Sequence, residues 1–528
     1  SDFDPTKNSN DVHRSRYLAQ TFKIFHRFVA CHPLSHWLVM EEKSIADIFD
    51  FIGFGRFQVC LLVIAGFGFM ADAIEVGVIT FLMEKVKEEW PGIEGWQINA
   101  LSTSVFSTKL LGSWIWGCLS DHLGRRQTFL LANMFLLITG CLSAAAPTYF
   151  WLVMARALVG LAIGGIVVPF DNLAESVPER SSASVCFAIE YFWTLGTLYS
   201  NVLAAFVIEP LGWRIYLLLS AVPILLACMG YFFLEESPMW LLDRGYDYEA
   251  WQVLQRMGQI NGKDLSNMAL VSYAREEDPS CKELLVPSLR RSLLSLGIIW
   301  WFGLFGYYGA SLGSALIFAD SGSSMNYGEL VFSCLGEIFG VTLAMCLAWR
   351  ISVHTLQPWF YLFSTLACIA VVIAHILKAP ALLLGTFAFI LRAASMGAIS
   401  ITWVLTPTAF PTHVRSTAHS ILYAAGSLGP VCASLWPEDT SLTVIMASYG
   451  AANLVCAILA QWQTKGLAAR GAFNSLISDL HASNLERRAR SSITRDSRAS
   501  RPTWASRPSW MSRPSWTSQP RTSNLLEH

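Results

Sequence analysis

Charged residues are scarce in this chain of 528 residues. They make up 14% of the sequence, whereas hydrophobic residues make up 53%, and a soluble globular protein carries about 25% charged residues. The formal net charge is −1, so the surplus of Lys and Arg that binds phosphate backbones is missing as well. The composition excludes an ordinary soluble enzyme and argues against nucleic acid as a partner.

Catalytic and metal-binding motifs are also missing. The sequence has no Walker loop, no HExxH motif and no CxxC motif. Its 12 cysteines stand singly, mostly inside apolar runs, as at Cys118 and Cys228. We therefore expect the cysteines to act as small hydrophobic residues, and we expect no cofactor, no metal and no enzymatic activity.

Long apolar runs are what the sequence has in abundance. A helix needs about 20 apolar residues to cross the hydrocarbon core of a bilayer, and twelve such runs are separated by polar loops. They lie at approximately 57–82, 97–119, 127–146, 149–170, 184–208, 213–234, 293–318, 328–349, 357–377, 380–404, 416–436 and 440–461. The sequence therefore predicts an all-α polytopic membrane protein with the lipid bilayer as its surroundings.

The loops differ in positive charge. Arg180, Arg290 and Arg350 follow even-numbered runs, whereas the loops after odd-numbered runs hold mainly Lys85 and Lys378 among their few basic residues. Positively charged loops stay in the cytoplasm. We therefore expect both termini to be cytoplasmic, in a membrane that the sequence does not identify.

Two stretches of the chain resemble one another. The fourth run reads ARALVGLAIGG before VPERSSAS, and the tenth reads LRAASMGAIS before FPTHVRSTAHS. Arg156 precedes Arg180 by 24 residues, and Arg392 precedes Arg415 by 23. This spacing predicts a duplicated six-helix unit, which is the plan of secondary transporters that bind their solute between two halves.

Polar segments separate and flank the two halves. The predicted parts are a cytoplasmic arm at 1–55, a first bundle at 56–234, a cytoplasmic central loop at 235–292, a second bundle at 293–466 and a tail at 467–528. The tail repeats RPTWAS, RPSWMS and RPSWTS, a composition that predicts disorder. It is interpreted as a solvated tail or as a regulatory or membrane-surface segment, and RRARSS at 487–492 suits a basophilic kinase.

The segment GCLSDHLGRR, from Gly117 to Arg126, is the most specific motif. Gly117 and Gly124 allow helices to approach closely, and Asp121 and Arg125 can form a charge-paired clasp that opens and closes as the two halves move. The segment resembles the cytoplasmic signature of the major facilitator superfamily.

Further segments resemble transporters related to synaptic vesicle protein two, which are close to the organic-ion and sugar porters of this superfamily. They are IGFGRFQ at 52–58, GFMADAIE at 68–75, RALVGLAIGG at 156–165, IEYFWTLGT at 189–197, GWRIYLLLSAVP at 212–223 and EESPMWLL at 235–242. The resemblance covers about 50 to 466. It implies twelve helices in two bundles that move a small charged or polar organic solute by alternating access.

The second half departs from that pattern. The loop after the eighth run reads LAWRISVHTLQP and keeps only Arg350, and the segment from Pro407 to Thr412 lacks the acid found in related porters. The gate in the second half is therefore weakened or rebuilt. This leaves open a second interpretation, in which a protein of this fold acts as a receptor or regulator without transporting.

Charged residues inside the bilayer are costly and functional by default. Asp72 and Glu75 share one face of the first run, and Lys109 in the second run lies at nearly the same depth as Asp72. Two interpretations follow. Lys109 and Asp72 form an ion pair, or Lys109 binds an anionic substrate while Asp72 or Glu75 takes up a proton.

Four more charged residues lie within the predicted spans. Arg156 and Arg392 occupy matching positions, which predicts symmetric structural roles. Glu190 is expected roughly 10 Å inside the cytoplasmic face, and Glu337 is a candidate proton or cation site or a hydrogen-bonding partner of a neighbouring helix. The predicted gating and structural charge network comprises Gly117, Asp121, Gly124, Arg125, Arg126, Arg156, Glu190, Arg392 and Arg415.

Aromatic residues complete the candidate site. Tyr307, Tyr308 and Trp403 can offer faces for stacking or cation–π contact with an organic ion, or they can face lipid. Trp300 and Trp301 are open to the same two interpretations. The predicted substrate and coupling residues are Asp72, Glu75, Lys109, Glu337, Tyr307, Tyr308 and Trp403. An organic ion suits this set better than a neutral sugar does, and protons are the predicted coupling ion.

Overall fold

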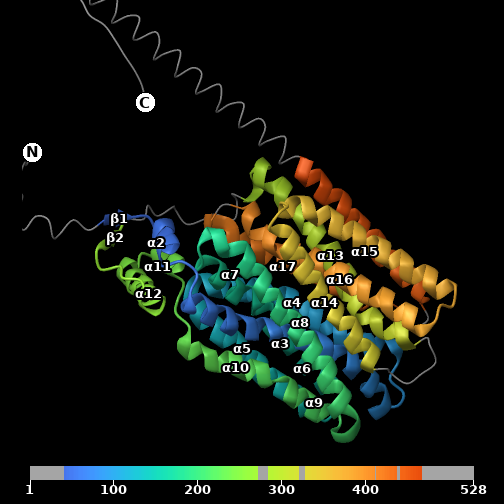
Figure 1. Ribbon diagram of the computed structural model, residues 1–528. Coiled ribbons are helices and arrows are strands. Elements are labelled where there is room, and N and C mark those ends of the chain that lie inside the picture. Colours follow the sequence, from blue (N-terminus) through green and yellow to red (C-terminus); the bar gives the residue numbers. More distant parts are fainter. Residues whose placement is uncertain (1–40, 272–283, 320–326, 411, 437–439, 466–528) are drawn as a thin grey trace, which may run out of the picture. The chain divides into compact units, whose positions relative to one another are not determined.

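The computed structural model describes residues 41–271, 284–319, 327–410, 412–436 and 440–465 (Figure 1). Nearly all of them belong to helices, and the long helices run side by side. Most of the predicted arm, the whole predicted tail and its kinase-type segment at 487–492 lie outside the described residues.

The first half of the bundle contains six predicted spans. They are α3 (Arg56–Glu89), α4 (Gly95–Leu123), α5 (Arg125–Ala144), α6 (Tyr149–Ile163) with η2 (Gly164–Ile166) and α7 (Val167–Glu175), α8 (Glu179–Leu211), and α9 (Trp213–Ser220) with α10 (Val222–Gly230) and η3 (Tyr231–Phe233). The fourth and sixth spans are thus made of consecutive shorter helices, and the pieces of each follow one another without an intervening loop.

The second half repeats this order. Its spans are α13 (Pro287–Ala319), α14 (Tyr327–Ala348), α15 (Val353–Ile376), α16 (Ala381–Leu405) with η5 (Thr406–Ala409), α17 (Thr412–Ala433) and a last helix, Leu442–Lys465. Within the described ranges, ten helical stretches are long and apolar enough to cross a membrane. The other two long helices are α4 and α17, which pack against each other.

The helix contacts repeat between the halves as the duplicated sequence predicts. In the first half α3 packs on α8 and α4 packs on α6, and in the second half α13 packs on α17 and α14 packs on α16. The most extensive contacts between the halves are those of α4 with α17 and of α8 with α14. These pairings are equivalent under an exchange of the halves, so the chain forms two similar six-helix bundles.

Glycines set the distance between the paired helices inside each bundle. A Cβ at Gly160 of α6 would lie 2.1 Å from the carbonyl oxygen of Val105, and one at Gly340 of α14 would lie 2.0 Å from that of Ala393. Glycines four residues apart, such as Gly336 and Gly340, let membrane helices bring their backbones into contact. Both bundles therefore hold their inner helices by backbone packing.

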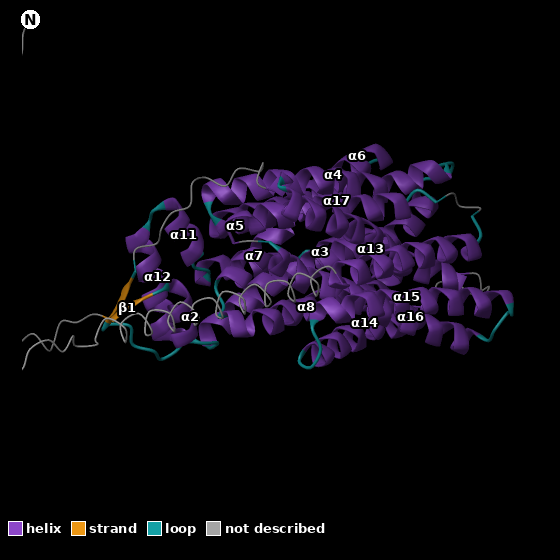
Figure 2. Cartoon of the chain, turned by 90° about the horizontal axis from the view of Figure 1, so that it is seen from above, coloured by secondary structure: helices purple, strands orange, loops and turns teal. Residues whose placement is uncertain are grey.

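The central segment and the end of the arm form a small attachment to the first bundle. It contains β1 (Glu41–Lys43), α2 (Ile45–Ile52), α11 (Pro238–Arg244), α12 (Asp247–Ile260) and β2 (Met268–Leu270). Strands β1 and β2 pair in parallel, and Ile48, Phe49 and Ile52 of α2 are buried. Figure 2 shows α2, α11, α12 and β1 together beside one end of the long helices. In the part of the chain that the structure describes, one short two-stranded sheet thus accompanies the helices.

Substitution of Gly340 by Ala tests the close packing of α14 and α16. The added methyl group would overlap the backbone of Ala393, and overpacking of this kind costs about 1–3 kcal/mol. We expect a lower thermal unfolding midpoint for the detergent-solubilised protein.

The control is Gly297→Ala on α13, where the new Cβ would lie an ordinary 3.7 Å from Leu422 Cδ2. Replacing a helical Gly by Ala there should be neutral or stabilising, because Ala favours the helix by about 1 kcal/mol. Equal midpoints for the two variants would contradict the close approach.

Candidate functional site

A buried ion pair lies at the centre of the bundle. Lys109 Nζ of α4 is 3.0 Å from Asp72 Oδ2 and 3.3 Å from Asp72 Oδ1 of α3. The two side chains are only 2% and 1% exposed. The sequence leaves two interpretations of Lys109 open. The structure shows the first of them, the ion pair with Asp72.

The second bundle completes the surroundings of this pair. Tyr423 of α17 donates a hydrogen bond to Asp72 Oδ2 at 3.2 Å, and Lys109 Nζ donates to the Tyr308 hydroxyl of α13 at 3.3 Å. Lys109 Nζ also lies 5.1 Å from the ring centre of Tyr423 and 5.8 Å from that of Tyr308. One bundle thus supplies the two charges, and the other supplies the hydroxyl groups and rings that contact them.

The two arginines at matching positions have the same kind of partner. Arg156 Nη2 lies 2.6 Å from Glu75 Oε2 in the first bundle, and Arg392 Nη2 lies 2.5 Å from Glu337 Oε1 in the second. Glu337 also accepts a hydrogen bond of 2.9 Å from Thr197 of α8, in the opposite bundle. Each arginine therefore neutralises an acid on a neighbouring helix.

A small cavity lies between the bundles beside the ion pair. Its lining includes Glu190 and Trp193 of α8, Tyr307 and Tyr308 of α13, Trp403 of α16 and Tyr423 of α17. About 20 Å³ is open to the centre of a water molecule, which is room for about one water. The predicted aromatic residues Tyr307, Tyr308 and Trp403 thus meet at one site, and none of them faces lipid.

The placement of Glu190 differs from the prediction. The sequence predicts that Glu190 lies near the cytoplasmic face, because the fifth apolar run begins at about residue 184. In the structure α8 begins earlier, at Glu179. Glu190 therefore lies about 16 Å along the helix, where it lines the central cavity. Its place in a cytoplasmic charge network is wrong.

Trp300 and Trp301 separate in the structure. Trp300 is fully buried, and its indole N–H donates a hydrogen bond of 2.9 Å to Thr406 Oγ1. Trp301 is 36% exposed on the outer surface of α13. The lipid-facing interpretation therefore holds for Trp301 alone.

Contacts between the bundles close the cavity towards both ends. On one side, Asn99 of α4 donates to the carbonyl oxygen of Trp436 at 3.1 Å, and Thr103 lies 3.0 Å from Ser434. Towards the other end, His419 Nδ1 of α17 lies 3.0 Å from Asp171 Oδ1 of α7. The bundles therefore touch on both sides of the cavity, and this arrangement is called occluded below.

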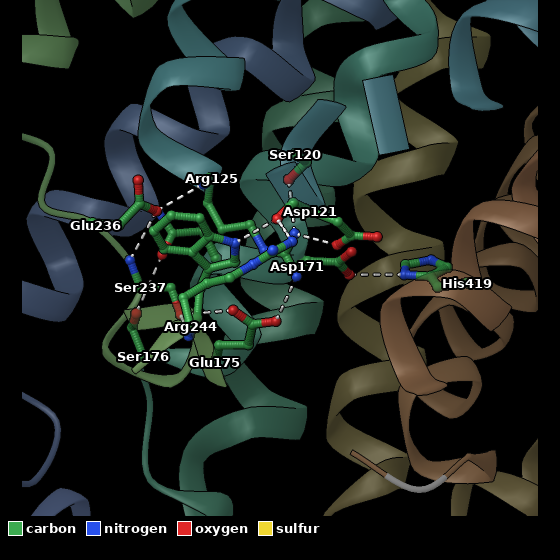
Figure 3. Close-up of polar contacts among 12 residues, drawn as sticks. Ser120, Asp121, Arg125, Asp171, Glu175, Ser176, Glu236, Ser237, Arg244 and His419 are labelled. Atoms are coloured by element: carbon green, nitrogen blue, oxygen red, sulfur yellow. Dashed lines mark hydrogen bonds and ion pairs between the residues drawn. The ribbon is translucent and has the colours of Figure 1, made fainter. Parts of the chain in front are cut away.

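The GCLSDHLGRR motif forms a charge cluster at one end of the first bundle (Figure 3). This end, which holds Arg125 and Arg126, is called the arginine-rich end. Arg125 Nη1 lies 2.7 Å from Asp121 Oδ1, and Arg125 Nη2 lies 3.4 Å from Glu175 Oε1. Glu175 also accepts a hydrogen bond of 2.7 Å from Ser237. The predicted Asp121–Arg125 pair is present, and its described partners belong to the first bundle and to α11, whose Trp240 donates a hydrogen bond of 2.9 Å to the backbone oxygen of Asp121.

Glu236 caps the start of α5 in this cluster. Its carboxylate accepts hydrogen bonds from the backbone N–H groups of Arg125, at 2.7 Å, and of Arg126, at 3.1 Å. A negative charge is favourable at this end of a helix. Burial raises the pKa of Glu236 above its usual range, although these backbone donors and the charge of Arg125 act in the opposite direction.

Two glycines of the motif are required by their surroundings. Gly124 has φ of 96°, and a Cβ there would lie 2.3 Å from Glu236 Oε2. A Cβ at Gly117 would lie 3.0 Å from Ser420 Oγ of α17. The absence of a side chain at Gly124 thus leaves room for the carboxylate of Glu236. The absence of one at Gly117 leaves room for Ser420 of the other bundle.

The predicted gate residues of the second half are Arg350 and Arg415. Arg350 is exposed after the end of α14, and the side chain of Arg415 lies outside the described residues. At this end the described bundles meet instead through His419 and Asp171. These two residues and Tyr423 were missed from the sequence, where the only signal was the unusual number of polar residues in the eleventh run.

Comparisons with known proteins agree with this architecture. The Sugar (and other) transporter family matches residues 59–461. The chain is 30% identical over 456 residues to the synaptic vesicle 2-related protein of Bos taurus, covering 81% of this chain and 82% of that protein. It is 26% identical over 433 residues to organic cation/carnitine transporter 7 of Arabidopsis thaliana, covering 73% of this chain and 86% of that protein.

Solved structures share the fold. The proton:xylose symporter XylE, bound to 6-bromo-6-deoxy-D-glucose, has a TM-score of 0.63 at 18% identity, covering 77% of this chain and 95% of that chain. The human organic anion transporter MFSD10 has a TM-score of 0.57 at 15% identity, covering 76% of this chain and 99% of that chain. The predicted twelve-helix, two-bundle fold is therefore confirmed.

Removal of one partner of the Asp72–Lys109 pair tests its contribution to stability. Asp72→Asn and Lys109→Gln each leave a buried group without its counter-charge, which costs about 3–5 kcal/mol. We expect each single variant to unfold at a clearly lower temperature than the parent in detergent.

The double variant Asp72→Asn/Lys109→Gln should lose less than the sum of the single losses, because no uncompensated charge remains. The control is Lys85→Gln, whose partner Glu88 is 60% exposed and whose loss should cost less than about 1 kcal/mol. Strictly additive effects would show that the two charges do not interact.

Proposed function

The chain belongs to the Sugar (and other) transporter family of the major facilitator superfamily, and from this premise we propose that it moves a small polar or charged organic solute by alternating access. It is a multi-pass membrane transporter, not an enzyme. The observation that carries the proposal is the small cavity between two bundles of repeated design, which is lined mainly by aromatic side chains and one acid, Glu190. A relative named for an organic cation and carnitine supports a charged organic solute.

Alternating access is supported by the kind of contact that holds the bundles together. Many of the described contacts at the interface are side-chain hydrogen bonds, such as Tyr191 with Thr342 at 2.7 Å and Thr103 with Ser434 at 3.0 Å, beside aromatic contacts such as Phe69 with Trp403. Water can replace such partners at a small net cost. The interface can therefore open at one end while the backbone packing inside each bundle is preserved.

Proton coupling is proposed to run through Asp72 and not through Glu75. The partner of Glu75 is Arg156, and arginine side chains are not deprotonated in proteins. The partner of Asp72 is Lys109, whose charge is more easily lost on burial. Because Tyr423 of the second bundle contacts Asp72, protonation of Asp72 would weaken a contact between the bundles.

The arginine-rich end is proposed to face the cytoplasm. Arg125, Arg126 and the exposed Arg180 and Arg244 lie in the motif or in the loops and helices near it, and positive loops are retained on the cytoplasmic side. In this orientation both termini are cytoplasmic. The cluster around Glu236 then stabilises the cytoplasmic end of the first bundle.

Transport into proteoliposomes tests the proposed function. The purified protein is assayed with radiolabelled organic cations, organic anions and sugars, with and without an inward proton gradient. We expect uptake of at least one charged solute to depend on the gradient. The variant Asp72→Asn/Lys109→Gln should lose this dependence, by at least tenfold, while it still exchanges solute across the membrane without a gradient.

Empty liposomes and Lys85→Gln are the controls. Gradient-driven uptake by the double variant at the parental rate would contradict coupling through Asp72. Ligand binding by the parent without uptake or exchange of any solute would favour the second candidate, a receptor of this fold, which the exposed Arg350 of the altered second-half loop supports.

A further inference from the structure

We propose that the central cavity binds an organic ammonium ion, with the Glu190 carboxylate as its counter-charge and the surrounding aromatic rings as its walls. This inference rests on the proposed function, because it names the class of solute for the same site. It starts from a difference between Glu190 and the other buried acids around the cavity.

The other three acids have basic partners. Asp72 is paired with Lys109, Glu75 with Arg156 and Glu337 with Arg392. Within the described part of the chain, Glu190 has no ion pair of this kind, and its buried Oε1 atom has no hydrogen-bond partner. Ionised Glu190 therefore gives the cavity a net negative charge, which an organic cation would neutralise.

The lining has the chemistry of a cation site. Trp193, Tyr308, Trp403 and Tyr423 border the cavity together with Glu190, and the face of an aromatic ring attracts a cation. Two of these rings, Tyr308 and Tyr423, already lie within 6 Å of the Lys109 ammonium group, at 5.8 and 5.1 Å. The same rings can therefore stabilise a second positive charge in the cavity.

The lining is unsuited to the other two solute classes. Leu304, Met396 and Ile399 make part of the lining apolar. The hydroxyl groups of the lining tyrosines, Tyr307, Tyr308 and Tyr423, are already hydrogen-bonded to Glu337, Lys109 and Asp72, so few groups are left for the hydroxyl groups of a sugar. An anion would be repelled by Glu190. Lys109 cannot compensate for this repulsion, because its ammonium group is 2% exposed and lies 3.0 Å from Asp72.

The cavity is too small for an organic cation in the occluded arrangement, since it has room for about one water molecule. Its lining comes from α8 in the first bundle and from α13, α16 and α17 in the second. Separation of the bundles at one end would therefore widen it directly. The solute would enter as the contacts at that end are released.

A proton competes with the cation for the same carboxylate. The groups around Glu190 are Ser400 of α16, Tyr423 of α17 and Glu337 of α14, whose charge is balanced by Arg392. Asp72, another buried acid of the same bundle, is balanced by Lys109. Binding of the cation is therefore expected to weaken as the pH falls, through protonation of Glu190.

Thermal stabilisation of the purified protein tests this inference. The probes are tetramethylammonium, tetraethylammonium and benzyltrimethylammonium, with benzoate and xylose as the anionic and neutral comparisons, each at pH 6 and pH 8. A ligand present at a hundred times its Kd stabilises by about 2.7 kcal/mol. We expect at least one ammonium ion to stabilise the parent, more strongly at pH 8, while benzoate and xylose have no effect.

Two variants locate the site. Glu190→Gln should raise the Kd of the ammonium ion at least tenfold and remove its pH dependence, and Trp403→Phe should raise it severalfold, because Phe attracts a cation less strongly than Trp. The control is Glu209→Gln, whose side chain is 63% exposed. Trp403→Phe keeps the test decisive if Glu190→Gln does not fold.

The outcomes separate this inference from the proposed function. Unchanged ammonium binding in Glu190→Gln, stabilisation by benzoate or xylose alone, or no stabilisation by any ammonium ion would overturn the cation site. Ammonium binding that depends on Glu190, without uptake into proteoliposomes, would support the site and contradict transport. Uptake of an anion or sugar that does not depend on Glu190 would support transport and contradict the site.

Discussion

Neutralisation of charge in a medium without water is the constraint on which this structure depends. A charged side chain in the bilayer core is costly unless another group compensates it. In the Asp72–Lys109 pair the two charges compensate each other, and hydroxyl groups of the other bundle add hydrogen bonds to both. Glu337 likewise accepts a hydrogen bond from Thr197 across the interface. The two bundles are therefore held in register by polar contacts, and a movement that separates them must supply water or solute in their place.

The same constraint divides the molecule into rigid and exchangeable parts. Inside each bundle, helices such as α14 and α16 touch backbone to backbone at glycines, so they cannot slide without overlap. Between the bundles, α4 meets α17 through hydroxyl and amide side chains whose partners can change. Polar residues at this interface also lower the hydropathy of α4 and α17, which is why these two helices do not qualify as spans by composition.

The sequence was sufficient for the fold and for part of the site. The apolar runs predicted the helices, and the repeated motifs predicted the two similar halves. Both patterns are local, because each can be read within one helix or within two neighbouring helices. The depth of Asp72 and Lys109 along adjacent helices was enough to suggest their ion pair. Glu190 was misplaced because α8 begins five residues earlier than its apolar run, and Tyr423 and His419 were missed because contacts between distant helices leave no local pattern.

The short pairing of β1 with β2 has a consequence for observing the molecule at work. It ties the end of the arm to the central segment, and Asn261 after α12 accepts a hydrogen bond of 3.0 Å from the backbone of Phe57 at the start of α3. This attachment therefore reports the orientation of the first bundle alone. The distance between a spin label on α12 and another at the exposed Trp359 of α15 would therefore report the movement of one bundle relative to the other.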